Sequence, residues 1–474
     1  MNRLGRLPRC RSQLGNLPCA VKRETHRKFE TSQHAERALR AIFINRFFHP
    51  DHSATSQMLS DLAFGLAQDG IEVSVITSRL HYDGNDSKLA LREMISGVDV
   101  RRIWTTRFGR SRLKLRAIDY LTFYISAAWT LLRMTSRGDI VVAMTDPPML
   151  SVIAAPIVKM RGARLVNWLQ DLFPEVADAL YSGGKLSAVL LRTLRKLRNI
   201  SLRQADMNVA IGELMAERLW QSNIPAERLC VRHNWADCKA VTPIAPRDNP
   251  LRTEWNLGND FVVGYSGNLG RAHEFESILA AIQTVGHDDD RSTRPSIRWL
   301  FIGGGHAFER LKAEVGKRGL TSVVFRPYQP RSQLAQSLSA ADVHIVTLKP
   351  ELEALIVPSK FYGTAAAGRP VLFIGASGGE IDRLTKQHNC GQTVANGDGE
   401  ALANAVLALS RDPQLILRMG INARHACEDF YEKSIVIQGW ASMFRGLSFT
   451  AEMPSAAEED QTFRPEIADT VLTE

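Results

Sequence analysis

Short apolar segments alternate with longer amphipathic segments along most of this chain. Strands are predicted at "AIFINRFF", "IEVSVITSR", "DIVVAMTDPP" and "ARLVNWLQDLFP", and "ADMNVAIG" and "RLCVRHNW" complete this first set. The segment "SQMLSDLAFGLAQDG", which follows the first strand, has the spacing of an amphipathic helix that ends at Gly70. Alternating strands and helices are typical of βαβ units and predict a parallel sheet covered by helices.

A polar, proline-rich stretch at residues 237–260 separates this set from a second one and is interpreted as an interdomain connection. Beyond it, "FVVGYSGNLG", "IRWLFIGGG", "VVFRPY" and "DVHIVTL" are predicted strands with helical segments between them. The expected fold class is therefore α/β, with two facing Rossmann-like domains built on parallel sheets. The expected divisions are a basic flexible extension at 1–38, the two domains at 39–240 and 241–424, a C-terminal helix packing back on the body at 425–447, and a disordered acidic tail at 448–474.

Composition narrows the class of protein. A chain of 474 residues is long enough for two or three domains, and 45% hydrophobic residues exclude a largely disordered protein. The net charge of +9 favours an acidic partner such as a nucleotide, a nucleic acid or an anionic membrane, although charge alone also keeps a protein soluble. The six cysteines form no CxxC or Cys/His cluster, so free thiols and no metal site are expected.

No targeting or membrane-spanning segment is predicted. The basic N-terminus lacks an apolar core of the kind that a secretory signal needs, and a mitochondrial transit peptide is the weaker alternative. No apolar run reaches about 18 residues. A cytoplasmic protein is expected.

Two glycine-containing loops follow predicted strands of the second domain. In "GYSGNLGRAHEFES", Gly267 and Gly270 permit close backbone approach, and Arg271 follows them at the start of a helix, which is an arrangement suited to a diphosphate. The alternative is a tight turn with a solvated arginine. The second loop, "FIGGGH", contains Gly304 and is by itself equally compatible with a simple turn.

A third loop leads into "VPSKFYGTAAAGRPVLF". Ser359 and Gly368 occupy positions suited to the N-cap and C-cap of a short helix. Lys360 lies in the first turn, where a cation opposes the helix dipole, so an anionic ligand would explain it. An ordinary surface lysine is the alternative.

Two common nucleotide-binding classes are excluded. The chain contains no GxxxxGK[ST] sequence, and the loop after the first strand, "RFFHPDHSATSQ", has no glycine. An NAD-dependent dehydrogenase would bind its dinucleotide at that first loop.

Six motifs, in order along the chain, resemble those of a known protein family. They are "RFFHPDHSATSQMLSDLAFGLAQDGIEVSVITSR", "TDPP", "QDLFPE", "HNWAD", "YSGNLGRAHEF" and "VPSKFYGTAAAGRPVLF". From about residue 41 to 447 the chain resembles a family 4 glycosyltransferase of the GT-B fold, and most of all the bacterial exopolysaccharide and O-antigen (colanic-acid-like) branch. The resemblance implies a nucleotide-sugar donor in the C-terminal half, an acceptor in the N-terminal half, and a retaining reaction that needs neither a metal nor a cofactor.

The resemblance also assigns the donor site, with two departures. Arg271 matches the diphosphate arginine, but Glu276 and Ser277 stand where the family usually has a lysine, so Lys360 is the candidate for the second cation. The family's two glutamates are replaced by Leu355 and Gly363. Glu380 is a candidate to approach the donor from the next loop, with a helix-start glutamate as the alternative. The expected donor-binding positions are Gly267, Asn268, Gly270, Gly304, Phe325, Arg326, Ser359 and Glu380.

On the acceptor side, Asp171 lies near the position at which many relatives place a histidine, and it is expected to orient hydroxyl groups or act as a base. Glu175, His49 and Asp51 are the further acceptor-binding candidates. Loop capping and local hydrogen bonding are the alternatives for these side chains.

Two basic segments with apolar faces, 101–134 and 183–204, suit an anionic membrane surface. The alternative is that Trp129, Leu131 and Leu132 belong to the core. Nucleic acid is disfavoured, because the basic residues are not interleaved with stacking aromatics. The expected protein is a sugar transferase acting on a lipid-linked saccharide at the inner face of the plasma membrane. A nucleotide-sugar epimerase and a catalytically weak assembly scaffold are the alternatives.

Overall fold

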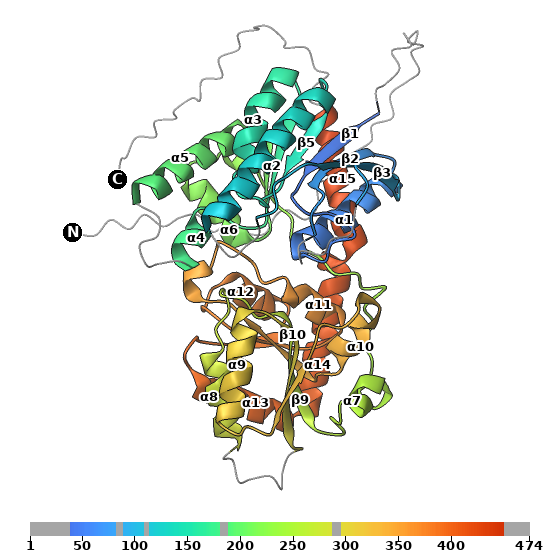
Figure 1. The fold of residues 1–474 in the computed structure, drawn as a ribbon. Helices are drawn as coiled ribbons and strands as arrows, with labels where there is room; N and C mark the ends of the chain where they lie inside the picture. Colours follow the sequence, from blue (N-terminus) through green and yellow to red (C-terminus); the bar gives the residue numbers. More distant parts are fainter. Residues whose placement is uncertain (1–37, 82–88, 109–112, 181–187, 287–294, 450–474) are drawn as a thin grey trace, which may run out of the picture. The chain divides into compact units, whose positions relative to one another are not determined.

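The computed structural model describes residues 38–81, 89–108, 113–180, 188–286 and 295–449 (Figure 1). Residues 39–449 of this part belong to one compact unit, Leu39–Glu474. The extension expected at 1–38 and the tail expected at 448–474 fall almost wholly outside the described residues.

The first sheet has eight strands in the order β3-β4-β2-β1-β5-β6-β7-β8. All neighbours pair in parallel except β3, which runs antiparallel to β4. The strands are β1 Arg40–Ile44, β2 Glu72–Ser78, β3 Arg92–Ile95, β4 Val98–Ile103, β5 Ile140–Ala143, β6 Arg164–Leu169, β7 Met207–Ala210 and β8 Leu229–Val231.

Helices cover both faces of the first sheet. Alternate residues of its central strand β1 point to opposite faces and so belong to two different cores. Phe43 packs in a core with α1 (Ala54–Gln68) and α15 (Lys433–Phe449), and its ring lies 6.3 Å from that of Phe444. Ile42 and Ile44 pack in a second core with α2 (Leu113–Met134) and α3 (Leu150–Arg161). The expected C-terminal helix, α15, therefore returns to pack on the N-terminal sheet (Figure 1).

The second sheet has six parallel strands in the order β11-β10-β9-β12-β13-β14. These strands are β9 Phe261–Asn268, β10 Ile297–Gly304, β11 Val323–Arg326, β12 Val343–Thr347, β13 Val371–Ile374 and β14 Gly391–Val394. One face packs against α8 (Glu276–Gly286), α9 (His306–Lys317) and α13 (Gly399–Arg411) (Figure 1). Part of the other face packs against α7 (Pro250–Glu254) and α11 (Lys360–Ala366). The expected α/β class with two parallel-sheet domains is confirmed.

The remaining helices of the N-terminal half are α4 Glu175–Leu180, α5 Ala188–Gln204 and α6 Glu213–Gln221. Those of the C-terminal half are α7 Pro250–Glu254, α8 Glu276–Gly286, α9 His306–Lys317, α10 Leu334–Ser339, α11 Lys360–Ala366, α12 Glu380–Gln387, α13 Gly399–Arg411 and α14 Pro413–Ala426. Among the helices in the described ranges, none combines the length and the apolar character that crossing a bilayer requires.

The chain passes between the two sheets twice, and the two passages are joined. Ala236, after β8, donates its N–H to the carbonyl of Tyr431, and Lys433 donates its N–H to the carbonyl of Ala236. The carboxylate of Glu432 accepts a hydrogen bond from the N–H of Cys238 at 2.8 Å. The connection after β8 and the start of α15 are thus held side by side.

Candidate active site

The two glycine-containing loops at the carboxyl ends of β9 and β10 pack against each other. Gly303 is paired with Gly267 and has φ +130°, and a Cβ on it would lie 2.3 Å from the Gly267 carbonyl oxygen. Gly305 has φ +118°, and its Cβ would lie 2.1 Å from Oδ1 of Asn268. Glycine is therefore needed at both positions for the loops to meet. Gly304 pairs with Asn268 between them.

Lys360 lies at the end of β9, although it belongs to α11. Its Nζ is 3.2 Å from Nε2 of His273 and 5.4 Å from the ring centroid of Tyr265. A Cβ on Gly267 would lie 3.1 Å from Cε of Lys360. Burial lowers the pKa of Lys360 to about 8, because a buried ammonium loses its hydration. The loop that begins at "VPSK" thus supplies a partly buried basic group to the glycine loop after β9.

The loop between β9 and α8 carries both Arg271 and His273. The Arg271 side chain is exposed. His273 is fixed by β12, since its Nδ1 lies 2.6 Å from the carbonyl oxygen of Thr347. His273 is a residue that the sequence interpretation passed over. The signal that could have found it is its place two residues after Arg271 in the glycine loop.

The two positions at which the family's lysine is missing have structural tasks. Glu276 is the first residue of α8, and its Oε2 accepts a hydrogen bond from the N–H of Phe275 at 3.2 Å. Ser277 donates its N–H to Glu274 at 2.6 Å, and its hydroxyl oxygen accepts from the N–H of Gly397. Both residues thus complete the start of α8 and its contact with the loop before α13.

The "VPSK" loop also differs from its expected geometry. Ser359 is the N-cap residue of α11, as expected, but its backbone is already helical and its side chain makes no capping hydrogen bond. Gly368 ends the segment in a left-handed conformation with φ +62°, as expected for a residue that terminates a helix. Leu355 is buried, and the Cβ position of Gly363 lies 3.5 Å from Leu338, so apolar packing occupies the positions of the family's glutamates.

Phe325 and Arg326 end β11. The ring of Phe325 stacks on Phe301 at 5.6 Å between centroids. The guanidinium of Arg326 lies 5.7 Å from the ring centroid of Trp255 and donates to the Phe325 carbonyl. Their contact with a nucleotide base stays a prediction.

Glu380 joins the two halves of the chain. Its Oε1 and Oε2 accept hydrogen bonds from the N–H groups of Glu213 and Leu214, each at 3.0 Å, and so cap α6. Glu380 is also the first residue of α12, which agrees with the helix-start alternative. Its N–H lies 3.3 Å from Oε2 of Glu353, whose pKa burial raises to about 7. Both oxygens of Glu380 therefore face α6 here, and its expected donor contact stays a prediction.

Asp171 follows β6 and faces the other half. It forms an isolated antiparallel bridge with Ile356, and the next residue, Leu172, donates its N–H to Leu355 at 2.9 Å. Burial, and secondarily the charge of Asp146, raise the pKa of Asp171 to about 7, against a hydrogen bond from Thr145 that lowers it. A carboxyl whose pKa is raised to this range can donate or accept a proton near neutral pH.

The other acceptor candidates are engaged locally. Glu175 is buried and forms a bidentate pair with Arg198, at 2.8 and 2.9 Å, and a further contact with Arg195 at 3.0 Å. Oδ1 of Asp51 accepts the N–H of Ser53 just before α1. The pKa of His49 is lowered, by burial first and then by the charge of Arg102. A direct role for these three in acceptor binding stays a prediction.

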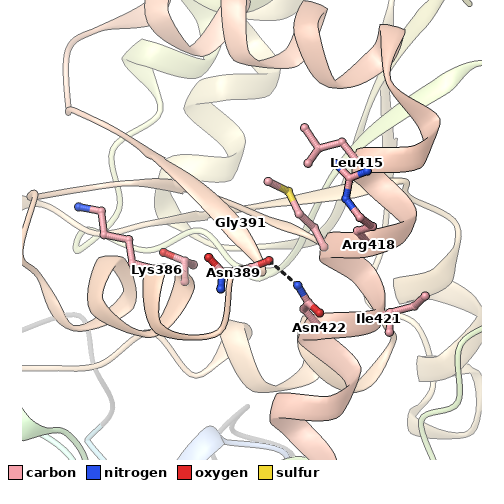
Figure 2. A pocket seen from close by; sticks show the side chains of 9 residues that line it. Lys386, Asn389, Gly391, Leu415, Arg418, Ile421 and Asn422 are labelled. Carbon is pink, nitrogen blue, oxygen red and sulfur yellow. Dashed lines mark hydrogen bonds between the residues drawn. The ribbon is translucent and has the colours of Figure 1, made fainter.

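A surface pocket of about 670 Å³ lies elsewhere, beside α12, α14 and the start of β14 (Figure 2). Figure 2 shows Asn422 of α14 donating to the Asn389 carbonyl at its edge. The pocket contains none of the expected site residues, because it lies at the amino end of β14 and they lie at the carboxyl ends of the strands. Within the described ranges, no group of three His, Cys, Asp or Glu residues is placed to hold a metal ion.

Comparison with known proteins identifies the family. Residues 54–235 match the glycosyl transferase 4-like domain, and residues 260–412 match the glycosyl transferases group 1. The chain belongs to the GT-B glycosyltransferases of family 4. The first match spans β2 to β8 and the second spans β9 to β14, and together they contain the candidate site residues other than His49 and Asp51.

Individual relatives agree with this assignment. The glycosyltransferase is 28% identical over 305 residues to the probable glycosyltransferase WbjE of Pseudomonas aeruginosa, covering 63% of this chain and 73% of that protein. It shares its fold with HepE of Anabaena in complex with UDP and glucose, at a TM-score of 0.64 and 17% identity over 86% of this chain and 100% of that one. It also resembles WaaG, a glycosyltransferase involved in lipopolysaccharide biosynthesis, at a TM-score of 0.60 and 14% identity over 86% and 100% of the respective chains.

Proposed function

We propose that this glycosyltransferase moves a sugar, with retention of configuration and without a metal, from a nucleotide-sugar donor to a lipid-linked saccharide in cell-surface polysaccharide synthesis. The observation that carries the proposal is the partly buried Lys360 ammonium at the end of β9. A cation that loses part of its hydration is costly unless an anion accompanies it, and the donor diphosphate is such an anion. In the described part of the chain no carboxylate forms an ion pair with Lys360.

The donor loops have the chemistry that this reaction needs. Breaking the bond between the sugar and the diphosphate places negative charge on the leaving phosphate oxygen, which fixed cations stabilise. Arg271 and Lys360 are the cations proposed for this task. The UDP bound by HepE supports a nucleoside diphosphate as the leaving group.

The acceptor is proposed to enter at the carboxyl ends of β5 and β6. There Asp171, whose pKa of about 7 suits proton exchange, would orient or deprotonate the attacking hydroxyl. The similarity to WaaG supports a saccharide of the cell surface as the acceptor.

A peripheral membrane position is proposed from two helices of the N-terminal half. On α2, Ile118, Leu121, Ile125 and Trp129 are all exposed. On α5, Leu197 and Ile200 are exposed beside Arg192 and Lys196, which are also exposed. An apolar stripe flanked by cations suits an anionic membrane surface, which would bring the enzyme to a lipid-linked acceptor at the inner face of the plasma membrane. Leu131, by contrast, is buried, so the core alternative holds for that part of α2.

Radiolabelled sugar transfer from a panel of UDP-, GDP- and ADP-sugars to extracted bacterial membranes tests the proposal. Label in the lipid fraction supports it. Release of a free epimerised sugar would instead show the epimerase, and nucleotide binding without turnover would show the scaffold.

A further inference from the structure

His273 and Lys360 form a partly buried basic pair. The Lys360 ammonium can only donate hydrogen bonds, so its contact with Nε2 of His273, at 3.2 Å, requires an unprotonated Nε2. The burial of the ring, together with the charge of Lys360, lowers the pKa of His273 to about 3. The imidazole is therefore neutral at physiological pH and able to accept.

The tautomer of His273 is set from the other side of the ring. Nδ1 lies 2.6 Å from the Thr347 carbonyl oxygen, which can only accept, so Nδ1 carries the proton. Thr347 ends β12, and its hydroxyl contacts both the N–H and the carbonyl of Glu274, at 3.3 and 3.2 Å. One contact with this strand end thus holds the ring and two hold the neighbouring residue, which directs the Nε2 lone pair at Lys360.

The Lys360 side chain has little freedom beside this ring. A Cβ on Gly267 would lie 3.1 Å from its Cε, so the side chain runs close along the Gly267 backbone, and the Tyr265 ring lies 5.4 Å from Nζ. One N–H of the ammonium is directed at Nε2 of His273, and two remain for another acceptor. An oxyanion at the end of β9 would satisfy them and offset the burial of the charge.

We infer that His273 is a positioning residue of the donor site, which through Nε2 holds the Lys360 ammonium in place to receive the leaving diphosphate. The inference rests on the proposed function, because the diphosphate belongs to that function. His273 contacts Lys360 and the end of β12, and this role requires no direct contact between His273 and the substrate.

Two substitutions separate the two ends of the imidazole. His273→Gln places an amide oxygen near the position of Nε2, where it can accept from Lys360. His273→Asn places an amide N–H near Nδ1, where it can donate to Thr347, but leaves nothing at Nε2. We expect His273→Asn to weaken UDP binding about tenfold, as loss of a positioned charged contact does, and His273→Gln to retain most of the wild-type affinity.

The experiment is calorimetric titration of UDP, with ADP and GDP as further probes, into the wild type, both His273 variants, Lys360→Met and His273→Asn/Lys360→Met. The double variant is expected to bind no more weakly than Lys360→Met, because His273 acts through Lys360. Thermal denaturation checks that each variant folds. The pH dependence of Lys360 acetylation, followed by mass spectrometry, is expected to change in His273→Asn and not in His273→Gln.

The outcomes distinguish failure of the proposed donor site from failure of the role inferred for His273. If the wild type binds none of the three nucleotides, the donor site and the inference both fail. If the wild type binds UDP and His273→Asn binds it equally well, with an unchanged acetylation profile, only the inference is overturned. Equal losses in the Gln and Asn variants would also overturn it, because they would show a general structural role. Should His273→Asn fail to fold, weak binding by a folded His273→Gln would likewise overturn it.

Discussion

The carboxylate of Glu380 accepts the backbone N–H of Leu214 at 3.0 Å, and so a side chain from the C-terminal half caps a helix of the N-terminal half. The adjacent N–H, that of Glu213, bonds to the second oxygen of the same carboxylate. Because the carboxylate is buried and charged, these contacts are among the strongest kind of protein hydrogen bond.

Glu380→Ala is expected to lower the free energy of unfolding by about 1–3 kcal/mol, since two N–H groups at the start of α6 lose their acceptor. Urea denaturation measures this change. Glu217→Ala is the matched control, because Glu217 also joins α6 to α12, through Arg383, but both partners are about half exposed. We expect the control to cost less than about 1 kcal/mol. Equal effects would contradict the capping role.

Arg198→Ala is expected to cost about 3–5 kcal/mol of stability, because it leaves the Glu175 carboxylate buried without its bidentate partner. Arg195→Ala is the control. Arg195 lies on the same helix and contacts the same carboxylate, but its side chain is 43% exposed, so we expect its removal to lower stability by less than about 1 kcal/mol. Thermal and urea denaturation test both variants. If Glu175→Gln instead changes only the KM for acceptor and leaves stability intact, Glu175 is an acceptor ligand.

Asp171→Asn is expected to stabilise the protein increasingly as the pH rises from 4 to 7. The pKa of Asp171 rises from 3.8 to about 7 on folding, so the folded protein retains a proton that the unfolded chain has lost in this range. The wild type therefore loses up to about 4 kcal/mol of stability as the pH rises from the unfolded pKa to the folded pKa, and the loss is complete above pH 7. The amide does not titrate. Denaturation of both proteins at pH 4.5 and 7.5 measures the difference, and a constant difference would contradict the raised pKa.

Lys360→Met and Arg271→Ala are expected to weaken UDP binding by about 1–3 kcal/mol each but to differ in stability. Burial lowers the pKa of Lys360 from 10.5 to about 8, so the charged form destabilises the fold at neutral pH, and its removal should raise the melting temperature. Arg271 is exposed, so its removal should leave the melting temperature nearly unchanged. Calorimetry and thermal denaturation together test both. Unchanged UDP affinity in Lys360→Met would refute its donor role.

Trp129→Ala is expected to reduce flotation with anionic liposomes at low salt, because it removes an exposed aromatic side chain from the apolar stripe of α2. Trp220→Ala on α6 is the matched control, since both tryptophans are 56% exposed. Wild-type protein that remains at the bottom of the gradient would refute membrane binding altogether.

The sequence by itself determined the two-sheet architecture. Its apolar segments of four to eight residues correspond to strands because parallel strands buried on both faces need such runs. The β3–β4 hairpin and β14 were not predicted, because β3 and β14 consist mainly of partly exposed residues, with little apolar signal. The glycine loops and Arg271 could likewise be placed at strand ends from topology alone.

Only the tertiary structure decided which side chains meet. Lys360 and His273 are 87 residues apart, and their contact depends on the parallel order that places β12 beside β9. Glu380 and Leu214 are 166 residues apart, and their hydrogen bond depends on the packing of the two halves. Local patterns encode which face of an element is apolar, whereas the pairing of polar groups, and the pKa shifts that burial gives them, arise only when distant segments exclude water from the same place.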